Sequence, residues 1–333
     1  MRLQATLVNI GHLPVATTRH SHGPLAVNGI VAWTGFGVGI VGLLLVDLLV
    51  VHRQAHKVRI REALFWSAVW IVLALLFAGG VFLVRGTASG VEFLTAYVIE
   101  KSLSIDNLFV FAAVFRHFRV PCKHQHRVLF WGVLGALVLR GVFIFTGIAL
   151  IERFTWMIYV FAALLLWAAI KMLTQGDDSV DPEHSRLLRY FRKLVPMTPG
   201  FVEGQLLVRV DGRLLATPLL AVLVFIEASD VLFAIDSIPA VLAVSTDPFI
   251  VYTSNVFAIL GLRSLYHALA AFLGRFRYLH HALAAILAFV AAKMGLAAWV
   301  HVPPWVSLGV VSVLLVMGVL ASLWLPDPKR PRR

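Results

Sequence analysis

Nine long apolar stretches divide the chain, and polar segments separate them. Most approach or exceed the roughly 20 residues that an α-helix needs to cross a bilayer. The period-two alternation of a transmembrane strand is absent, so we predict that each stretch is a helix. The predicted spans are 29–52, 62–84, 91–115, 127–151, 154–174, 215–240, 249–273, 281–301 and 304–325.

Lys and Arg gather in alternate connections between these spans. They fall in 53–61, 116–127, 171–213, 275–277 and 329–333, whereas the other connections hold only Arg2, Arg19, Arg85 and Arg153. Because cytoplasmic loops carry the excess of basic residues, the pattern predicts an N-terminus outside the membrane and a C-terminus in the cytoplasm. Nine spans put every basic loop on one face, which supports the count.

The same pattern organises the chain into segments. We expect a flexible extracytoplasmic lead over 1–28, two membrane helices over 29–84, and a three-helix unit over 91–174. A cytoplasmic loop over 175–213 then joins it to a second three-helix unit over 214–301. A last membrane helix over 304–325 and a basic cytoplasmic tail over 326–333 follow. The predicted fold is an all-α, polytopic membrane helix bundle.

Composition agrees with this class. The chain is 60% hydrophobic and 14% charged, with a mean hydropathy of +0.87, which a soluble domain of 333 residues could not bury. A net charge of +12 would suggest nucleic acid in a soluble protein. Here it is mostly a topology signal, so the expected partner is the lipid bilayer and not nucleic acid. Cys122 is the single cysteine and excludes an intramolecular disulfide.

Charged residues lie inside several predicted spans, where each costs roughly 3 kcal/mol on insertion scales. The acids are Asp47, Glu100, Asp106, Glu227, Asp230 and Asp236, and the basic residues are Lys101, Arg140, Arg263 and Lys293. They could simply be buried ion pairs that hold helices together. Even if every basic residue pairs, two carboxylates remain, and a buried carboxylate without a partner takes up a proton or binds a cation.

Helical spacing sharpens the acidic set. Glu227 and Asp230 are three residues apart and share a helix face, whereas Asp236 would point elsewhere on a straight helix. Pro239 removes a backbone hydrogen bond, so we expect an unwound stretch at 235–239 that turns Asp236 back toward Asp230. Transporters build cation sites from such discontinuous helices.

The expected ligands are all oxygen donors. Carboxylates, the amide of Asn107, the hydroxyl of Ser237 and backbone carbonyls suit Mg²⁺, Ca²⁺ or Mn²⁺ better than Cu⁺ or Zn²⁺. No histidine adjoins the acids in sequence; His267 is the nearest candidate, and a lone membrane histidine is more often a packed group.

Three matches in the same order suggest an internal repeat. Glu100 to Asn107 matches Asp230 to Ser237, with an acid, five residues, Asp and a small polar residue in each. Leu-x-Leu-Arg recurs at Arg140 and Arg263, and an Ala-rich Lys-Met recurs at Lys171 and Lys293. Each copy has three helices, an odd number, so the second copy would run through the bilayer in the opposite sense. We therefore predict an inverted repeat, which is a transporter architecture.

The motifs also resemble those of the TerC/Alx family of integral membrane proteins. The resemblance is carried by Glu100-Lys-Ser-Leu-Ser-Ile-Asp-Asn, Phe225-Ile-Glu-Ala-Ser-Asp, the run from Tyr252 to Tyr266, and Asp47-Leu with Arg61-Glu-Ala-Leu-Phe-Trp-Ser. It covers about 29–325, and the lead is longer than the pattern needs. It implies bacterial inner-membrane metal-ion homeostasis, chiefly Mn²⁺ efflux, and a link to tellurium resistance. It maps the family's acids onto Glu100, Asp106, Glu227, Asp230 and Asp236, with Asn107, Ser237 and Asn255 at signature positions and Asp47 flanking.

Two functional classes follow from these features. The leading hypothesis is a secondary transporter that exports Mn²⁺ or a similar divalent cation as its transported ion, with no permanently bound cofactor. No Gly-x-x-x-x-Gly-Lys-Ser/Thr loop is present, so a proton gradient or another ion gradient would drive it. The alternative is a membrane scaffold or assembly factor with structural ion pairs. An intramembrane enzyme is not expected, because no hydrolase or metalloprotease motif occurs.

Overall fold

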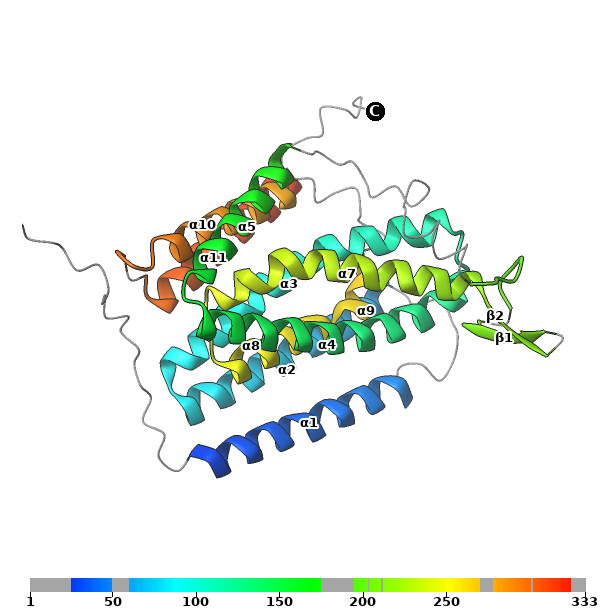
Figure 1. The fold of residues 1–333 in the computed structure, drawn as a ribbon, viewed down its shortest axis with the longest axis horizontal. Helices are drawn as coiled ribbons and strands as arrows, with labels where there is room; N and C mark the ends of the chain where they lie inside the picture. Colours follow the sequence, from blue (N-terminus) through cyan, green and yellow to red (C-terminus); the bar gives the residue numbers. More distant parts are fainter. Residues whose placement is uncertain are drawn as a thin grey trace, which may run out of the picture. The chain divides into compact units, whose positions relative to one another are not determined.

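The computed structural model describes residues 25–49, 60–174, 195–269 apart from 203 and 211, 278–300 and 302–324. The first range forms a helix, α1 (Leu25–Leu49), which belongs to a unit of its own and is described by itself. The other described residues belong to a second unit, which holds the remaining helices (Figure 1).

Helices of the second unit follow the predicted spans. They are α2 (Ile60–Arg85), α3 (Thr87–His117), α4 (Cys122–Arg153), α5 (Met157–Thr174), α7 (Pro218–Leu242), α8 (Pro248–Leu260), α9 (Leu262–Leu269), α10 (Leu279–Gly295) and α11 (Pro304–Trp324). Two of them begin at a capping residue followed by proline: the Thr217 hydroxyl accepts from the backbone of α7, and the Asp247 carboxylate accepts from that of α8.

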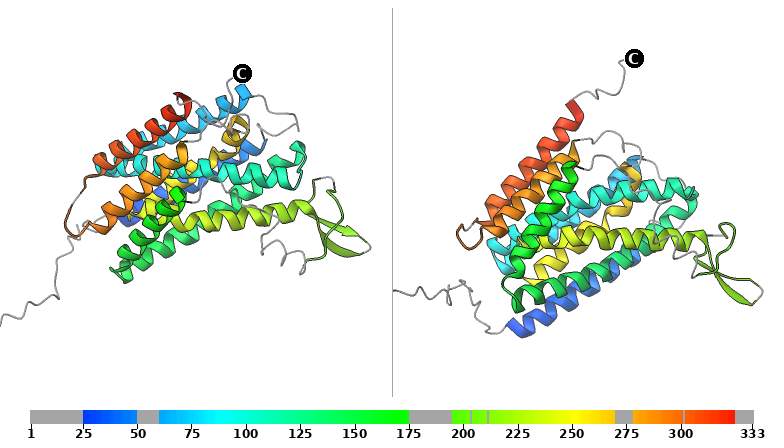
Figure 2. Two further views of the ribbon diagram at one scale, coloured as in Figure 1. Left: turned by 90° about the horizontal axis from the view of Figure 1, so that it is seen from above. Right: turned by 45° about the horizontal axis from the view of Figure 1, so that its top comes forward.

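α3 occupies the centre of this unit. It packs against α2, α7, α8 and α11, while α4 lies along α7 and α8. α5 packs along α10, and α10 along α11, so these three helices form a group inclined to the rest (Figures 1 and 2). The arrangement brings the two charged helices, α3 and α7, side by side.

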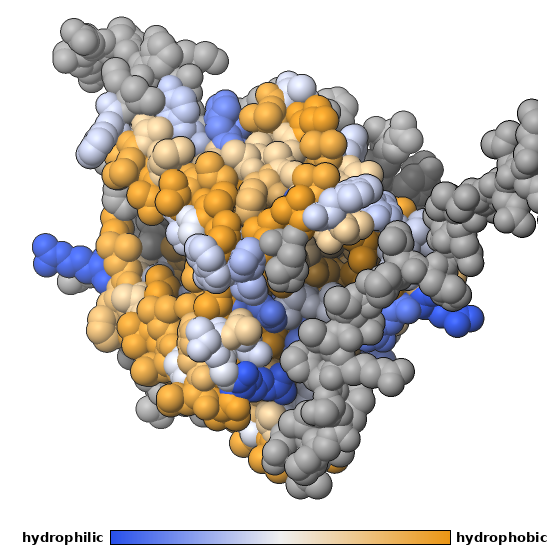
Figure 3. Space-filling model, turned by 90° about the vertical axis from the view of Figure 1, so that its left-hand side faces the viewer, coloured by the Kyte–Doolittle hydropathy of each residue, from blue (hydrophilic) through white to orange (hydrophobic). Residues whose placement is uncertain are grey.

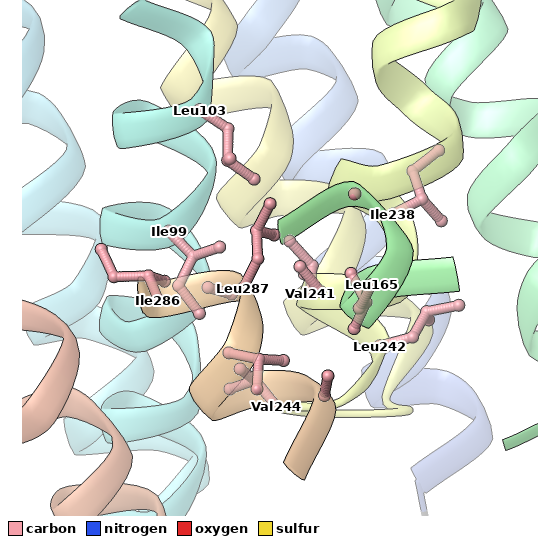
Figure 4. Close-up of a cluster of buried hydrophobic side chains, with 14 of the residues drawn as sticks. Ile99, Leu103, Leu165, Ile238, Val241, Leu242, Val244, Ile286 and Leu287 are labelled. Atoms are coloured by element: carbon pink, nitrogen blue, oxygen red, sulfur yellow. The ribbon is translucent and has the colours of Figure 1, made fainter. Parts of the chain in front are cut away.

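An apolar cluster joins the two groups of helices. Ile99 and Leu103 of α3, Leu165 of α5, Ile238 of α7 and Leu287 of α10 converge in it (Figure 4). Small residues lie where α5 and α10 meet, and a Cβ at Gly295 would be in ordinary contact with Cβ of Ala162, at 3.8 Å. Close packing of small residues is the usual way in which membrane helices associate.

The outer surface is apolar. Leu83 is 89% exposed, Val84 84% and Leu76 66%, and orange, hydrophobic residues dominate the face drawn in Figure 3. Such a surface is costly in water and favourable in lipid. Among the described residues, six helical stretches are long and apolar enough to cross a membrane: α2, α4, α5, α7, Pro248–Tyr266 and α11. The chain is therefore a helical, multi-pass membrane protein, while the count of nine spans stays a prediction.

The expected unwinding of α7 is wrong. α7 is helical from Pro218 to Leu242, with Pro239 inside it. Pro239 stands in the last turn, so it removes one hydrogen bond close to the helix end, and Ala243 N still donates to Pro239 O at 3.0 Å. Packing of α7 against α3, α4 and α5 holds the helix through this position.

A discontinuity occurs instead in the next predicted span. The span 249–273 is two helices, α8 and α9, separated at Gly261. A Cβ at Gly261 would lie 2.8 Å from Nζ of Lys101 and 3.2 Å from Cβ of Trp70. The Lys101 ammonium donates to the Ala258 carbonyl at 3.0 Å, so a half-buried cation caps the chain just before the break.

The predicted loop 175–213 is described from residue 195 on, and a β-hairpin lies at its end. β1 (Leu207–Val210) pairs antiparallel with β2 (Arg213–Ala216), in a register that sets Val210 opposite Arg213. Gly212 takes a positive φ of 78° at the turn, which a glycine adopts at no steric cost. The hairpin leads directly into Thr217 and the start of α7.

Candidate functional site

Arg140 of α4 joins a carboxylate of α3 to a carboxylate of α7. Its Nε and Nη2 donate to Oδ2 and Oδ1 of Asp230 at 3.2 and 3.0 Å, a bidentate pair. Its Nη1 forms an ion pair with Oε1 of Glu100. The side chains of Glu100 and Arg140 are 0% and 1% exposed. Two carboxylates thus face one guanidinium in a dry site, which carries a surplus negative charge when both acids are ionised.

Neutral polar groups complete this site. Ser237 lies 3.5 Å from Nη1 of Arg140 through its hydroxyl, and the Asn107 amide donates to Oδ1 of Asp230 at 3.4 Å. Both residues are buried. Ser104 donates to Oε1 of Glu100 at 3.5 Å. The structure therefore brings together Glu100, Asp230, Arg140, Asn107 and Ser237, while their role as ligands stays a prediction.

One oxygen of Glu100 stays unused. Oε2 is buried and has no hydrogen-bond partner within the described part of the chain. A buried carboxylate oxygen without a donor is costly, because nothing replaces the water that it has lost. The atom is a ready ligand for a proton or a cation.

Glu227 lies one helical turn before Asp230 on α7. Its carboxylate rests on α4 at Gly135, where a Cβ would come within 2.6 Å of Oε2 and 2.5 Å of Cδ. Among the described residues Oε2 has no hydrogen-bond partner. The absence of a side chain at Gly135 creates the space that this carboxylate occupies.

The two remaining predicted ligands of the second unit are Asp236 and Asp106. Asp236 is half-buried and lies within the electrostatic reach of Lys171 and Arg140. Asp106 belongs to α3, but its side chain lies outside the described residues, so its role stays a prediction. The same holds for Asp47, which belongs to α1 in the other unit.

The other three predicted counter-charges make contacts different from those of Arg140. Lys101 donates to the backbone near Gly261. Arg263 is buried at the start of α9. Lys293 of α10 interacts with Glu92 of α3. Of the four basic residues, Arg140 is the one that the hydrogen bonds and ion pairs given above join to predicted ligands.

Asn255 is a buried amide in the middle of α8. Its Oδ1 and Nδ2 both lack a partner among the residues that the structure describes. The same is true of the Tyr97 hydroxyl on α3, the helix against which α8 packs. The sequence indicated Asn255 but not Tyr97 or Gly135. A Gly-x-x-Gly spacing at 132–135 is the signal that could have marked α4 as a close-approach face.

The chemistry available at the site is that of hard oxygen donors. No group of three or more His, Cys, Asp or Glu side chains that could hold a metal ion occurs among the described residues. The ligands at hand around Arg140 are two carboxylates, an amide and a hydroxyl. Such a set suits Mg²⁺, Ca²⁺ or Mn²⁺ rather than a soft metal.

Comparisons with known proteins agree on one family. A 301-residue alignment with an Escherichia coli K12 protein, whose name proposes a membrane-bound redox modulator, Alx, is 46% identical and covers 88% of this chain and 94% of that one. Myxococcus xanthus has an uncharacterised membrane protein that is 50% identical over 291 residues (87% and 91% of the two chains). A Rickettsia conorii membrane protein is 38% identical over 292 residues (88% and 97%).

No solved structure matches the chain. The model of the integral membrane protein TerC family matches residues 85–330, from the last residue of α2 to beyond the end of α11. The match includes every residue of the site around Arg140, and the chain therefore belongs to the TerC family of integral membrane proteins.

Proposed function

We propose that this protein is a secondary transporter that exports a divalent metal cation, chiefly Mn²⁺, in exchange for protons, so that the proton gradient supplies the energy. The observation that carries the proposal is the site at Arg140. Carboxylates from α3 and α7 converge there in a buried site that lacks enough positive charge. The unpartnered Oε2 of Glu100 gives a cation a free oxygen ligand. In this proposal Asp106, Glu227 and Asp236 are further ligands or gates on either side.

Helix packing supports the inverted repeat that such a transporter needs. In the repeat, α3, α4 and α5 correspond to α7, α8 with α9, and α10. A two-fold relation between the copies requires that α3 pack on α8 as α7 packs on α4, and both pairs are in contact. It also requires α3 to meet α7 and α5 to meet α10, which they do. The site at Arg140 would then lie between the two copies, with the N-terminus outside a bacterial inner membrane and the C-terminus in the cytoplasm.

The alternative is a membrane scaffold whose buried charges only hold helices together. The bidentate pair of Arg140 and Asp230 fits this reading. The surplus carboxylate does not, because a structural pair needs one acid for each base. The name of the E. coli relative includes a redox role. This chain has a single cysteine, so a dithiol–disulfide pair within one chain could not carry such a role.

The test is Mn²⁺ flux in proteoliposomes. Purified full-length protein with a pH gradient should accumulate ⁵⁴Mn²⁺ on one side. Asp230→Asn and Glu100→Gln should each reduce the initial rate at least about tenfold, because each removes a charged ligand. Glu152→Gln, at the exposed end of α4, is the matched control and should keep the wild-type rate. Wild-type rates in both site variants, with correct insertion, would overturn the proposal in favour of the scaffold.

A further inference from the structure

The guanidinium of Arg140 occupies the carboxylate oxygens that a transported cation would need. Both oxygens of Asp230 accept from it, at 3.2 and 3.0 Å, and Oε1 of Glu100 pairs with its Nη1. A fork-shaped, bidentate geometry uses the in-plane lone pairs of a carboxylate, which are also those used by metal ions. The residues are almost fully buried, so water does not screen the contact.

Although Oε2 of Glu100 is free, a cation that Glu100 and Asp230 hold together cannot join this arrangement as it stands. A divalent ion held by both Glu100 and Asp230 would lie beside the Arg140 guanidinium in a low-dielectric site, where like charges repel strongly. One of the two cations must therefore leave. Arg140 is part of the protein chain, so only its side chain can move away. The metal ion, in contrast, can dissociate from the site.

The surroundings give the displaced guanidinium other partners. Ser237 lies at 3.5 Å from Nη1, on the same helix face as Asp230 and two turns further along. Asp236 is half-buried and already lies within the electrostatic reach of Arg140. A swing of the Arg140 side chain toward Ser237 would keep the guanidinium beside a hydroxyl of α7, with the charge of Asp236 still within its electrostatic reach.

We propose that Arg140 is a tethered internal cation that competes with the transported divalent cation for Glu100 and Asp230, so that the guanidinium and the metal ion bind these carboxylates in turn. This inference rests on the proposed function and adds how the site releases its cargo. Return of the guanidinium expels the metal ion and restores the charge of the closed site, as an exchange between two mutually exclusive cations requires.

Equilibrium binding of Mn²⁺ to the purified full-length protein tests the competition. Arg140→Gln removes the charge but keeps a polar, shorter side chain, and it should tighten Mn²⁺ binding about tenfold, the usual scale of coupling between competing ligands. Added guanidinium chloride at millimolar concentration should weaken Mn²⁺ binding in this variant and leave the wild type unchanged at the same ionic strength. Arg153→Gln, at the exposed end of α4, is the control and should bind as the wild type does.

A measurement on the wild type keeps the test independent of whether Arg140→Gln folds. In protein labelled with ¹⁵N-arginine, the infrared difference spectrum on Mn²⁺ addition should show a shift of a guanidinium band that Arg140→Lys abolishes. A spectrum without an arginine band, or a folded Arg140→Gln variant that binds Mn²⁺ no more tightly than the wild type, would overturn the competition. A wild type without saturable Mn²⁺ binding would instead overturn the proposed function, so the two failures are distinguishable.

Discussion

Gly135 offers the sharpest test of the packing around the candidate site. The glycine faces the Glu227 carboxylate, and a Cβ there would lie 2.5 Å from Cδ and 2.6 Å from Oε2. Real Cβ atoms do not come so close to other atoms, so Gly135→Ala must push the carboxylate away. Gly132, one turn earlier on α4, is a matched control, because its Cβ would meet Cγ2 of Ile226 at 3.4 Å, an ordinary contact.

Both substitutions should raise the free energy of unfolding through helix propensity, but only Gly135→Ala should lower it through a steric clash. Replacing a glycine inside a helix by alanine stabilises it by about 1 kcal/mol. Gly132→Ala should keep most of this gain. Gly135→Ala also forces the Glu227 carboxylate aside, which costs about 1 kcal/mol, the low end for overpacking, because this carboxylate is the end of a flexible, half-buried side chain. Gly135→Ala should therefore be less stable than Gly132→Ala by about 1 kcal/mol, and its rate of Mn²⁺ transport should fall because Glu227 is displaced.

Unfolding of each variant in one detergent, followed by a tryptophan or circular-dichroism signal, measures this difference. A double-mutant cycle then assigns it. In a Glu227→Ala background the added methyl group has room, so the penalty of Gly135→Ala should largely vanish, as coupled neighbours require. The reasoning is refuted if Gly135→Ala is as stable as Gly132→Ala, or if the penalty persists after Glu227 is truncated.

Three further substitutions test the structure outside this contact. Lys101→Met removes the donor to the buried Ala258 carbonyl and should lower the free energy of unfolding by about 1–3 kcal/mol; an unchanged melting curve would contradict the contact. Thr217→Ala removes the cap of α7 and should cost about 1 kcal/mol, with Thr217→Ser restoring most of it. Arg85→Gln breaks the partly exposed ion pair with Asp247, at 2.8 Å, and should cost at most about 1 kcal/mol and less at high salt. A large, salt-independent loss would show that the pair does more than the structure indicates.

The sequence determined the class of protein and most of its elements. Long apolar runs can satisfy their backbone in lipid only as helices, and the helix bounds follow the predicted spans. The charged residues inside the spans were visible for the same reason, since each stands out in an apolar run. Their motifs identified the family, which the match over residues 85–330 confirms. The orientation and the inverted repeat, which came from the same patterns, stay predictions.

Only the tertiary structure decided which of these residues meet and where a helix breaks. Pro239 predicted a break in α7, but contacts with neighbouring helices keep α7 intact, and the break lies at Gly261 where Lys101 approaches. Counting charges predicted that basic and acidic residues pair, yet Arg140 pairs with two acids while Lys101 bonds to a carbonyl. Partners on different helices depend on how the helices pack, and hydrophobic spacing along one chain carries no information on that distance.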